Sequence, residues 1–290
     1  MKIGVVGYGS IGSRHARNLH TLGHDVLIYD PAIIGLNDKG KERMIYGQCD
    51  AVVIATPTPF HAAGLLACVE LGKHVFVEKP IATKTEGIAA SLVMAAEKDL
   101  IVMMGNNLRF HPCVQQAKEW IAAGEIGTPI WAQFTCGQLN RKYTDSVVLN
   151  WGAHEVDMAL HLLGPARVVT ASVAFNAGGG IEDIADFLLI HDNGCRSSFH
   201  LDYVTPNEIR EAWIVGDKER IGLELRNRNA SLGTHAKGFG GSFDDDYFLE
   251  MKAFVDRIEN KITPGATGGD GLAALDILLD VRSKAGVEPR

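Results

Sequence analysis

Two histidines and an aspartate lie at helical spacing in the segment NWGAHEVDMALH, which runs from Asn150 to His161. Offsets of three and seven residues put His154, Asp157 and His161 near one face of a helix. Such side chains can bind a metal, exchange a proton with a substrate, or pack in a core. The tight His-x-x-x-His pair of many zinc sites is absent, and no cysteine or carboxylate cluster lies nearby in the sequence, so we predict no metal site. Proton exchange and core packing remain.

A second set of residues suited to chemistry lies near the N-terminus, where KIGVVG leads into GYGSIG. In this Gly-x-Gly-x-x-Gly pattern Gly7 permits a tight turn, Gly9 lets the backbone approach a pyrophosphate, and Gly12 allows close packing of helix on strand. The following helix presents its N-terminal N–H groups to the anion. A plain structural turn is the alternative. The predicted cofactor-binding residues of this turn are Gly7, Tyr8, Gly9, Ser10, Ile11 and Gly12.

Asp30 ends the second apolar run, about twenty residues beyond the glycines, where a carboxylate can bind ribose hydroxyls. No Arg or Lys directly follows it, and a carboxylate repels a 2′-phosphate. We therefore predict NAD rather than NADP as the cofactor.

The first half of the chain alternates short apolar runs with helical segments. Apolar runs of this length suit strands that are buried on both faces of a parallel sheet. Helix start signals lie between them: Thr58 with Pro59, and a capping box at 83–86 before a helix that extends to Lys98. The fold class is therefore α/β, with an N-terminal doubly wound parallel sheet of the Rossmann type. The predicted strands are 2–7, 25–30, 50–56, 74–78 and 100–105.

The pattern changes in the second half, where strict alternation indicates strands with one buried face. In 196–204, Ser197, Phe199, Leu201 and Tyr203 share one face. We predict two domains: a Rossmann domain over 1–122, and an α/β domain with an open, mostly antiparallel sheet over 123–290. Residues 231–242 are predicted to form a loop.

Composition limits the kind of partner. The 290 residues carry a net charge of −7 and no basic run, which argues against nucleic acid and acidic membrane surfaces. No segment is long and apolar enough to cross a bilayer. The five cysteines are scattered and form no CxxC pair, so we expect reduced thiols and a cytoplasmic protein.

Several segments resemble the glucose–fructose oxidoreductase/inositol dehydrogenase/MocA (Gfo/Idh/MocA) family. The most specific are DAVVIATPTPFHAAGLLACVELGKHVFVEKPIA from Asp50 onward and NNLRFHPCVQQAKEWIAAGEIGTPIW over 106–131. The opening GYGSIGSRHA and the late segment DDDYFLEMKAFVDRIENKI are also similar. The resemblance touches nearly the full length.

The resemblance implies an NAD(P)-dependent dehydrogenase or reductase that acts on a CH–OH group of sugars, cyclitols or related polyols. It implies that Lys79, in Glu78-Lys79-Pro80, lies by the nicotinamide and the substrate hydroxyl, and that Glu78 contributes to the cofactor site. Thr56, Pro57 and His61 would line the cofactor. Taken alone, a lysine here could be an exposed turn residue, and the bond to Pro80 is hypothesised to be cis. The family also implies a homo-oligomer, a dimer or tetramer, formed through the C-terminal sheet.

The family pattern Asp-x-x-x-His-x-x-Asp matches the segment with which we began, except that Asn150 replaces the first aspartate. By this match His154 is the general base and Asp157 orients the substrate, while His161 is a packing residue. Histidine exchanges protons near neutrality, and an ammonium such as Lys79 nearby would keep it neutral. Asn150 can still hydrogen-bond a hydroxyl, but it holds no negative charge.

The sequence therefore predicts an NAD-dependent oxidoreductase that moves hydride between nicotinamide and a sugar-like or cyclitol alcohol or ketone, nucleotide sugars included. Lys79 and His154 are the predicted catalytic residues, and Asn150, Asp157 and Arg109 are the predicted substrate-binding residues. The alternative is an NAD-binding regulatory or assembly protein without turnover, which Asn150 favours.

Overall fold

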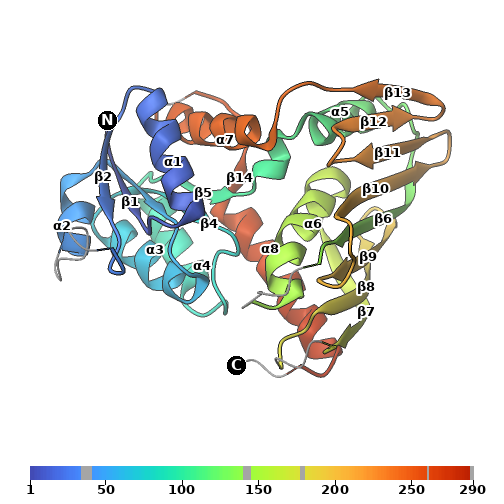
Figure 1. The fold of residues 1–290 in the computed structure, drawn as a ribbon, viewed down its shortest axis with the longest axis horizontal. Coiled ribbons are helices and arrows are strands. Elements are labelled where there is room, and N and C mark those ends of the chain that lie inside the picture. The colour runs from blue at the N-terminus through green and yellow to red at the C-terminus, as the bar shows by residue number, and fades with distance from the viewer. Residues whose placement is uncertain (34–40, 140–144, 177–179, 260, 288–290) are drawn as a thin grey trace. The chain divides into compact units, whose positions relative to one another are not determined.

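The computed structural model describes residues 1–33, 41–139, 145–176, 180–259 and 261–287. The chain divides into two compact units (Figure 1). The first unit comprises Met1–Phe110 and Ser242–Leu275, and the second comprises His111–Gly241 and Asp276–Arg290.

The first unit contains a six-stranded sheet, sheet A, in the order β14-β5-β4-β3-β1-β2. Strands β1 to β5 are parallel, and the short β14 joins β5 in the antiparallel direction. The chain moves from β1 outward to β2 and then returns to the other side of β1 for β3, so the strand order reverses beside β1. All five predicted strands are present, and the predicted parallel α/β sheet is confirmed. The strands are β1 Lys2–Val6, β2 Asp25–Tyr29, β3 Ala51–Ile54, β4 His74–Glu78, β5 Val102–Gly105 and β14 Ala266–Thr267.

Helices cover both faces of sheet A. On one face, α1 (Ser10–Thr21) and α7 (Phe243–Ile258) enclose a cluster that includes Val5, Phe76 and Phe254. The Phe76 and Phe254 rings meet edge to face, with 5.6 Å between their centroids. The opposite face packs on α2 and α3: Gly4 lies against Ile45 of α2, and Gly64 of α3 lies against Ile54. The helices of this second face are α2 Lys41–Gln48, α3 His61–Glu70 and α4 Ile88–Glu97.

Two predicted helix starts differ from the observed ones. A 3₁₀ turn (η1, Thr58–Phe60) precedes α3, with Pro57 rather than Thr58 at its N-cap. Helix α4 begins at Ile88 after Gly87, which has φ of 78° and no side-chain cap, so the predicted capping box at 83–86 was wrong. Glycine adopts this left-handed conformation without penalty, and here it redirects the chain into the helix.

The second unit contains an eight-stranded sheet, sheet B, in the order β13-β12-β11-β10-β6-β9-β8-β7. Every pairing is antiparallel except that of β6 with β9, as the mostly antiparallel prediction requires. Helices α5 (Pro112–Ala122) and α6 (Val147–Leu163) pack on one face. The strands are β6 Pro129–Gly137, β7 Ala166–Ala174, β8 Ile184–His191, β9 Arg196–Asp202, β10 Ile209–Gly216, β11 Arg220–Glu224, β12 Asn229–Leu232 and β13 His235–Gly238.

The predicted alternation in β9 is confirmed, because Ser197, Phe199, Leu201 and Tyr203 are all buried. Phe199 stacks between Phe134 of β6 and Phe187 of β8, its exact neighbours in strand register, at centroid distances of 4.9 and 4.5 Å. Leu201 on the same face meets α6, where Gly152 leaves room for it.

Residues 231–242 were predicted to form a loop, and this was wrong. Strands β12 and β13 form a hairpin here, joined by a two-residue turn at Gly233 and Thr234. Gly233 adopts φ of +57°, which a short hairpin turn favours. The apolar–polar alternation is weak in this pair because β13 is an exposed edge strand.

The observed division of the chain differs from the predicted boundary at 122/123 in two places. Helix α5 belongs to the second unit, where His111 Nε2 bonds the Leu225 carbonyl at 3.1 Å. Residues 242–275 belong to the first unit because α7 completes the core of sheet A, and α8 (Gly268–Lys284) passes from the first unit into the second. A boundary drawn along the sequence cannot represent a helix that returns to an earlier core.

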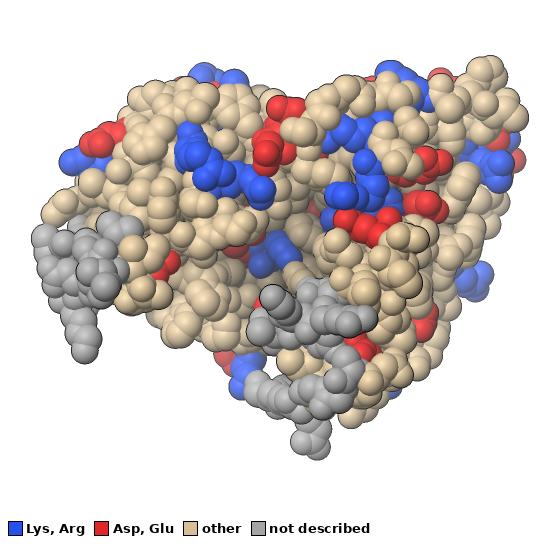
Figure 2. All heavy atoms as spheres, viewed as in Figure 1, with Lys and Arg blue, Asp and Glu red and all other residues tan. Residues whose placement is uncertain are grey.

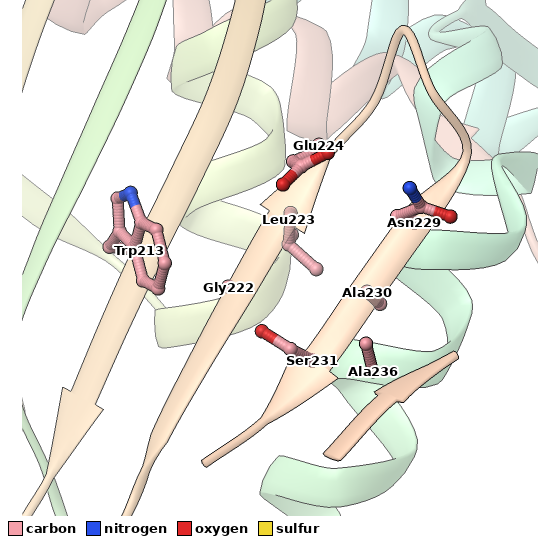
Figure 3. Close-up of a pocket in the computed structure, with 8 residues that line it drawn as sticks. All are labelled: Trp213, Gly222, Leu223, Glu224, Asn229, Ala230, Ser231 and Ala236. Carbon is pink, nitrogen blue, oxygen red and sulfur yellow. The ribbon is translucent and has the colours of Figure 1, made fainter. Parts of the chain in front are cut away.

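The other face of sheet B is open in this chain. Trp131 of β6 and Trp213 of β10 point away from the face that carries Phe134, and Trp131 is 38% exposed. A pocket opens along β10 to β13 (Figure 3) and is lined by Trp213, Gly222, Leu223, Glu224, Asn229, Ala230, Ser231 and Ala236. Within the described residues, none of the helices combines the length and apolar character needed to cross a membrane.

The contribution of α7 to the first unit can be measured with two substitutions in the same helix. Phe254 is fully buried against sheet A, so Phe254→Ala should lower the free energy of unfolding of that unit by about 3–5 kcal/mol. Leu249 is 45% exposed, so Leu249→Ala should change it by less than about 0.5 kcal/mol. Urea unfolding monitored by circular dichroism provides the comparison. Equal losses in the two variants would show that α7 does not complete this core.

Candidate functional site

The carboxyl ends of five neighbouring parallel strands in the first unit carry the candidate residues. Gly7, Asp30, Thr56, Lys79 and Asn106 follow β1, β2, β3, β4 and β5, each within two residues of the strand's end. Parallel strands present these ends at one edge of the sheet. The order reverses between β1 and β3, and open α/β sheets bind ligands at such a point. The sequence prediction had assigned four of these five residues to the site.

The glycine-rich turn has the shape that a pyrophosphate requires. Gly7 adopts φ of +90°, and a Cβ there would lie 2.4 Å from the Ala55 carbonyl oxygen. A Cβ on Gly12 would lie 1.9 Å from the Gly7 oxygen, whereas a Cβ on Gly9 would meet no described atom within 4 Å. Gly7 and Gly12 are thus required for packing, and Gly9 leaves space open at the start of α1. That helix begins at Ser10 without a side-chain cap. An uncapped helix N-terminus beside open space fits an anion.

Asp30 holds the glycine-rich turn in place. One of its carboxylate oxygens accepts the Tyr8 backbone N–H at 2.7 Å, and the other accepts that of Ala32 at 2.8 Å. A carboxylate has lone pairs for further donors, so these bonds leave it able to accept hydroxyl groups of a ribose. The predicted ribose ligand therefore also fixes the loop that would bind the phosphates.

Two buried polar atoms at this edge have no hydrogen-bond partner among the described residues: Thr56 Oγ1 and Asn106 Oδ1. Buried polar atoms are usually satisfied, so these two atoms at the strand edge are available to hydrogen-bond a ligand. Thr56 was predicted from the family resemblance. Asn106 was missed, although it is the first polar residue after the apolar run of β5, and that position was the available signal.

Glu78, predicted to contribute to the cofactor site, bonds to α1. Its side chain is buried and bonds His15 Nε2 of α1 at 2.6 Å, and Gly105 leaves room for it. Burial alone would raise the pKa of Glu78, but the hydrogen bond and charge of His15, with Lys79 nearby, outweigh it and hold the pKa below its ordinary value. Glu78 thus joins the end of β4 to the helix that follows the glycine-rich turn.

Lys79 and its neighbours occupy the end of β4. The Lys79–Pro80 bond is cis, as hypothesised from the sequence, and Lys79 is half-buried. His61 reaches this region with Nδ1 at 2.8 Å from the Pro80 carbonyl oxygen, and its Nε2 lies 2.8 Å from that of Thr56. Pro57 is exposed at the turn before α3.

Arg109 forms its polar contacts within the first unit. Its guanidinium lies 3.3 Å from Asp270 and 3.5 Å from the Gly265 carbonyl, and the residue is only 6% exposed. Burial would raise the pKa of Asp270, but Arg109 and Thr267 hold it below its ordinary value. Arg109 therefore anchors the connection from β14 into α8, a contact that the sequence did not predict.

The remaining predicted residues lie on α6 in the second unit. Ser146 caps this helix by accepting the Val148 and Leu149 N–H groups. Asn150 donates its amide to the Tyr203 hydroxyl at 2.8 Å. One and two turns further along, His154 is 8% exposed and Asp157 is 2% exposed. The three side chains therefore lie along one stripe of a single helix, as their spacing predicted.

His161 lies at the far end of the same helix against α5. The Lys118 ammonium bonds the His161 carbonyl at 2.6 Å and lies 3.4 Å from its Nδ1. This agrees with its predicted packing role. Within the described part of the chain, no group of three or more metal-binding side chains occurs.

A buried ion pair fixes α6 on sheet B. Arg210 Nε of β10 donates a hydrogen bond of 2.7 Å to one carboxylate oxygen of Glu155, and Nη2 lies 2.7 Å from the same oxygen. The guanidinium also lies 5.5 Å from the Trp151 ring centre. Burial raises the pKa of Glu155, and it raises that of the neighbouring Cys136 to about 12. Breaking such a pair would leave a buried charge, so it constrains the helix that carries His154.

Neither the pocket in Figure 3 nor the surface charge singles out a different site. The pocket contains none of the predicted residues. On the face drawn in Figure 2, described basic and acidic side chains lie among one another rather than in one surface of a single sign. The candidate residues therefore remain those at the strand ends of sheet A, together with Asn150, His154 and Asp157 on α6.

Comparison with known families decides the identity of the two units. Residues 41–106 match the oxidoreductase family with an NAD-binding Rossmann fold, and residues 114–222 match the GFO/IDH/MocA C-terminal domain. The chain belongs to the Gfo/Idh/MocA oxidoreductase family. The first unit is its NAD-binding domain, which agrees with the open space at Gly9.

Individual Gfo/Idh/MocA relatives match over nearly the whole chain. The scyllo-inositol 2-dehydrogenase (NAD(+)) of Bacillus subtilis is 28% identical over 96% of this chain and 92% of its own length. The UDP-N-acetylglucosamine 3-dehydrogenase of Acidithiobacillus ferrooxidans is 27% identical over 80% and 76%. A solved levoglucosan dehydrogenase, in complex with NADH and levoglucosan, shares the fold with a TM-score of 0.87 at 18% identity, covering 99% of this chain and 97% of that one.

Substitution of Gly9 should weaken cofactor binding without affecting folding. Because a Cβ there meets no neighbour, Gly9→Ala should leave the melting temperature within about 2 °C of wild type while weakening NADH binding about tenfold or more. NADH fluorescence titration and thermal unfolding measure the two effects. Gly47→Ala, at an exposed position of α2 where an added Cβ also meets no described atom within 4 Å, is the control for added bulk at a glycine. Unchanged NADH affinity in folded Gly9→Ala would place the cofactor elsewhere.

Glu78 should make stability depend on pH. Because its pKa is lowered in the folded protein, its contribution is present above the ordinary value of 4.5 and is lost as the pH falls below that value. Glu78→Gln should therefore cost about 2 kcal/mol of unfolding free energy at pH 7 and progressively less toward pH 3. Urea unfolding of both proteins across this range gives the difference. A difference that grows on acidification would contradict the assignment.

Proposed function

We propose that this protein is an NAD-dependent dehydrogenase or reductase of a secondary alcohol or ketone in a sugar-like or cyclitol substrate, nucleotide sugars included. The observation that carries the proposal is the edge of sheet A, where the space at Gly9, two unpartnered polar atoms and Lys79 occupy neighbouring strand ends. The related inositol and sugar dehydrogenases support the class of substrate.

The residues of the first unit fit an NAD molecule. The turn from Gly7 to Gly12 would hold the pyrophosphate through backbone N–H groups, and Asp30 would bind the ribose hydroxyls. Thr56 and Pro57 would line the cofactor, with His61 and Glu78 supporting their strand ends. When bound, NAD supplies a nicotinamide carbon that accepts or donates hydride. The carboxylate of Asp30 favours NAD over NADP because it repels a 2′-phosphate.

In the proposed reaction, side chains of the protein stabilise negative charge on the substrate oxygen and transfer its proton. In this proposal the Lys79 ammonium stabilises negative charge on that oxygen as the alcohol is oxidised. His154 removes the hydroxyl proton, or returns it during reduction, because imidazole exchanges protons near neutrality. Asp157 and Asn150 orient neighbouring hydroxyls. Arg109 acts indirectly, through the segment that it anchors by Asp270.

We further propose that the protein works in the cytoplasm as a homo-oligomer, a dimer or a tetramer, formed through sheet B. The open face that carries Trp131 and Trp213 supports this assembly, since large apolar surfaces are usually covered by a partner. All five cysteines are buried thiols, which suits a reducing compartment.

One observation favours a second function, that of an NAD-binding protein without turnover. Asn150 stands at the first acidic position of the family pattern, and its amide donates to Tyr203. An amide cannot relay a proton as a carboxylate can. Turnover assays separate the two functions.

Lys79→Met and His154→Gln should each lower kcat about 10²–10⁴-fold with a sugar or cyclitol substrate while NADH still binds. Absorbance of NADH, followed with a panel of cyclitols, sugars and nucleotide sugars, identifies the substrate and gives the rates. Lys84→Met and His20→Gln, at exposed positions of the first unit, are the controls for loss of a lysine and of a histidine. If wild-type protein binds NADH and turns over no member of the panel, the second function is correct.

A further inference from the structure

His61 is buried between two backbone carbonyl groups. It opens α3 and is 1% exposed. Its Nδ1 lies 2.8 Å from the Pro80 oxygen and its Nε2 lies 2.8 Å from the Thr56 oxygen. Each ring nitrogen therefore faces a carbonyl oxygen at hydrogen-bond distance.

These partners determine how many protons the ring must carry. A carbonyl oxygen only accepts hydrogen bonds, and neutral imidazole has a single N–H. A neutral ring would therefore direct a nitrogen lone pair at a carbonyl lone pair across 2.8 Å. Rotating the ring by 180° exchanges nitrogens for carbons and would lose both bonds. Only the doubly protonated ring donates to both carbonyls.

Two other buried histidines show the contrast. His111 donates from Nε2 to the Leu225 carbonyl and accepts the Cys113 N–H at Nδ1, so a neutral ring satisfies it. His191 bonds the Gly164 carbonyl and the Ser197 hydroxyl, and a hydroxyl can donate as well as accept. Burial lowers the pKa of both rings, to about 3 for His111. His61 differs from both, because each of its two partners is a carbonyl oxygen that can only accept a hydrogen bond.

The two carbonyls belong to the connections that follow neighbouring strands of sheet A. Thr56 lies two residues beyond β3 and Pro80 lies two residues beyond β4, directly after Lys79. Thr56 also carries the buried, unpartnered Oγ1 at the cofactor edge. Among the described residues no carboxylate lies within ion-pair distance of His61, so the carbonyl dipoles are its hydrogen-bonded counterparts.

We propose that His61 carries a proton on both ring nitrogens and is a positioning residue, a cationic bridge that fixes the Thr56 and Lys79–Pro80 connections for the cofactor. Its side chain does not contact the reacting atoms. Hydrogen bonds from a charged donor are roughly twice as strong as neutral ones, which suits the task of holding two loops. The consequence for the cofactor rests on the proposed function, whereas the protonation state does not.

The protonation state is tested by ¹⁵N NMR of the full chain labelled in its histidine rings, at pH 7 and without cofactor. The His61 ring signals are assigned by through-bond correlation to the His61 backbone signals of wild-type protein. Both His61 nitrogens should show directly bonded protons, whereas His111 should show one. A single protonated nitrogen on His61 would overturn the proposal. This measurement uses wild-type protein, so it decides the matter even where a variant fails to fold.

The positioning role is tested by NADH titration of His61→Gln and His61→Ala. Loss of two charge-assisted bonds should weaken NADH binding about tenfold or more, with a smaller effect in the glutamine variant, which keeps one donor group. His191→Gln removes a comparable bridge from the second unit and should bind NADH as wild type does. Wild-type affinity in folded His61→Ala would overturn this role. Failure of wild-type protein to bind NADH would instead refute the proposed function and leave the NMR result standing.

Discussion

The geometry of parallel strands is the constraint on which the rest of this structure depends. Five strands that run in one direction must present their carboxyl ends at the same edge, and the reversal beside β1 separates the connections that leave that edge. Residues far apart in sequence, from Gly7 to Asn106, thereby become neighbours in strand order. Close packing at Gly7 and Gly12 gives the first turn its shape, and Gly9, with no described atom near its Cβ position, leaves room for a ligand.

Side-chain hydrogen bonds connect the segments at this edge. Asp30 holds the glycine-rich turn, Glu78 joins the end of β4 to His15, and His61 joins the connections after β3 and β4. Each of these three side chains, predicted to contribute to the cofactor site, also bonds to the protein that surrounds it. A catalytic site needs such support, because a reacting group that moves by an ångström loses much of its effect.

Sequence reasoning succeeded where the determining pattern is local. Apolar runs and strict alternation identified the strands of sheet A and β9, and the spacing on α6 placed Asn150, His154 and Asp157 along one stripe. It failed where the determinant lies far along the chain. Nothing in the sequence near Phe254 shows that α7 returns to sheet A, and the partner of Glu78 lies 63 residues away. The same holds for Arg109 and Asp270, whose contact depends on the path of β14 and α8. Asn106 was within reach, since it directly follows a buried strand.

The central proposal is that the Lys79 ammonium and the His154 imidazole act on one substrate oxygen when NAD and substrate are bound. A crystal structure of the full chain with NADH and a bound substrate or substrate analogue tests this most directly. The account predicts that Lys79 Nζ and a ring nitrogen of His154 both lie within about 3.2 Å of the same ligand oxygen. A complex in which the ligand oxygen nearest the nicotinamide contacts neither side chain, or in which NADH lies away from the Gly7–Gly12 turn, would contradict it.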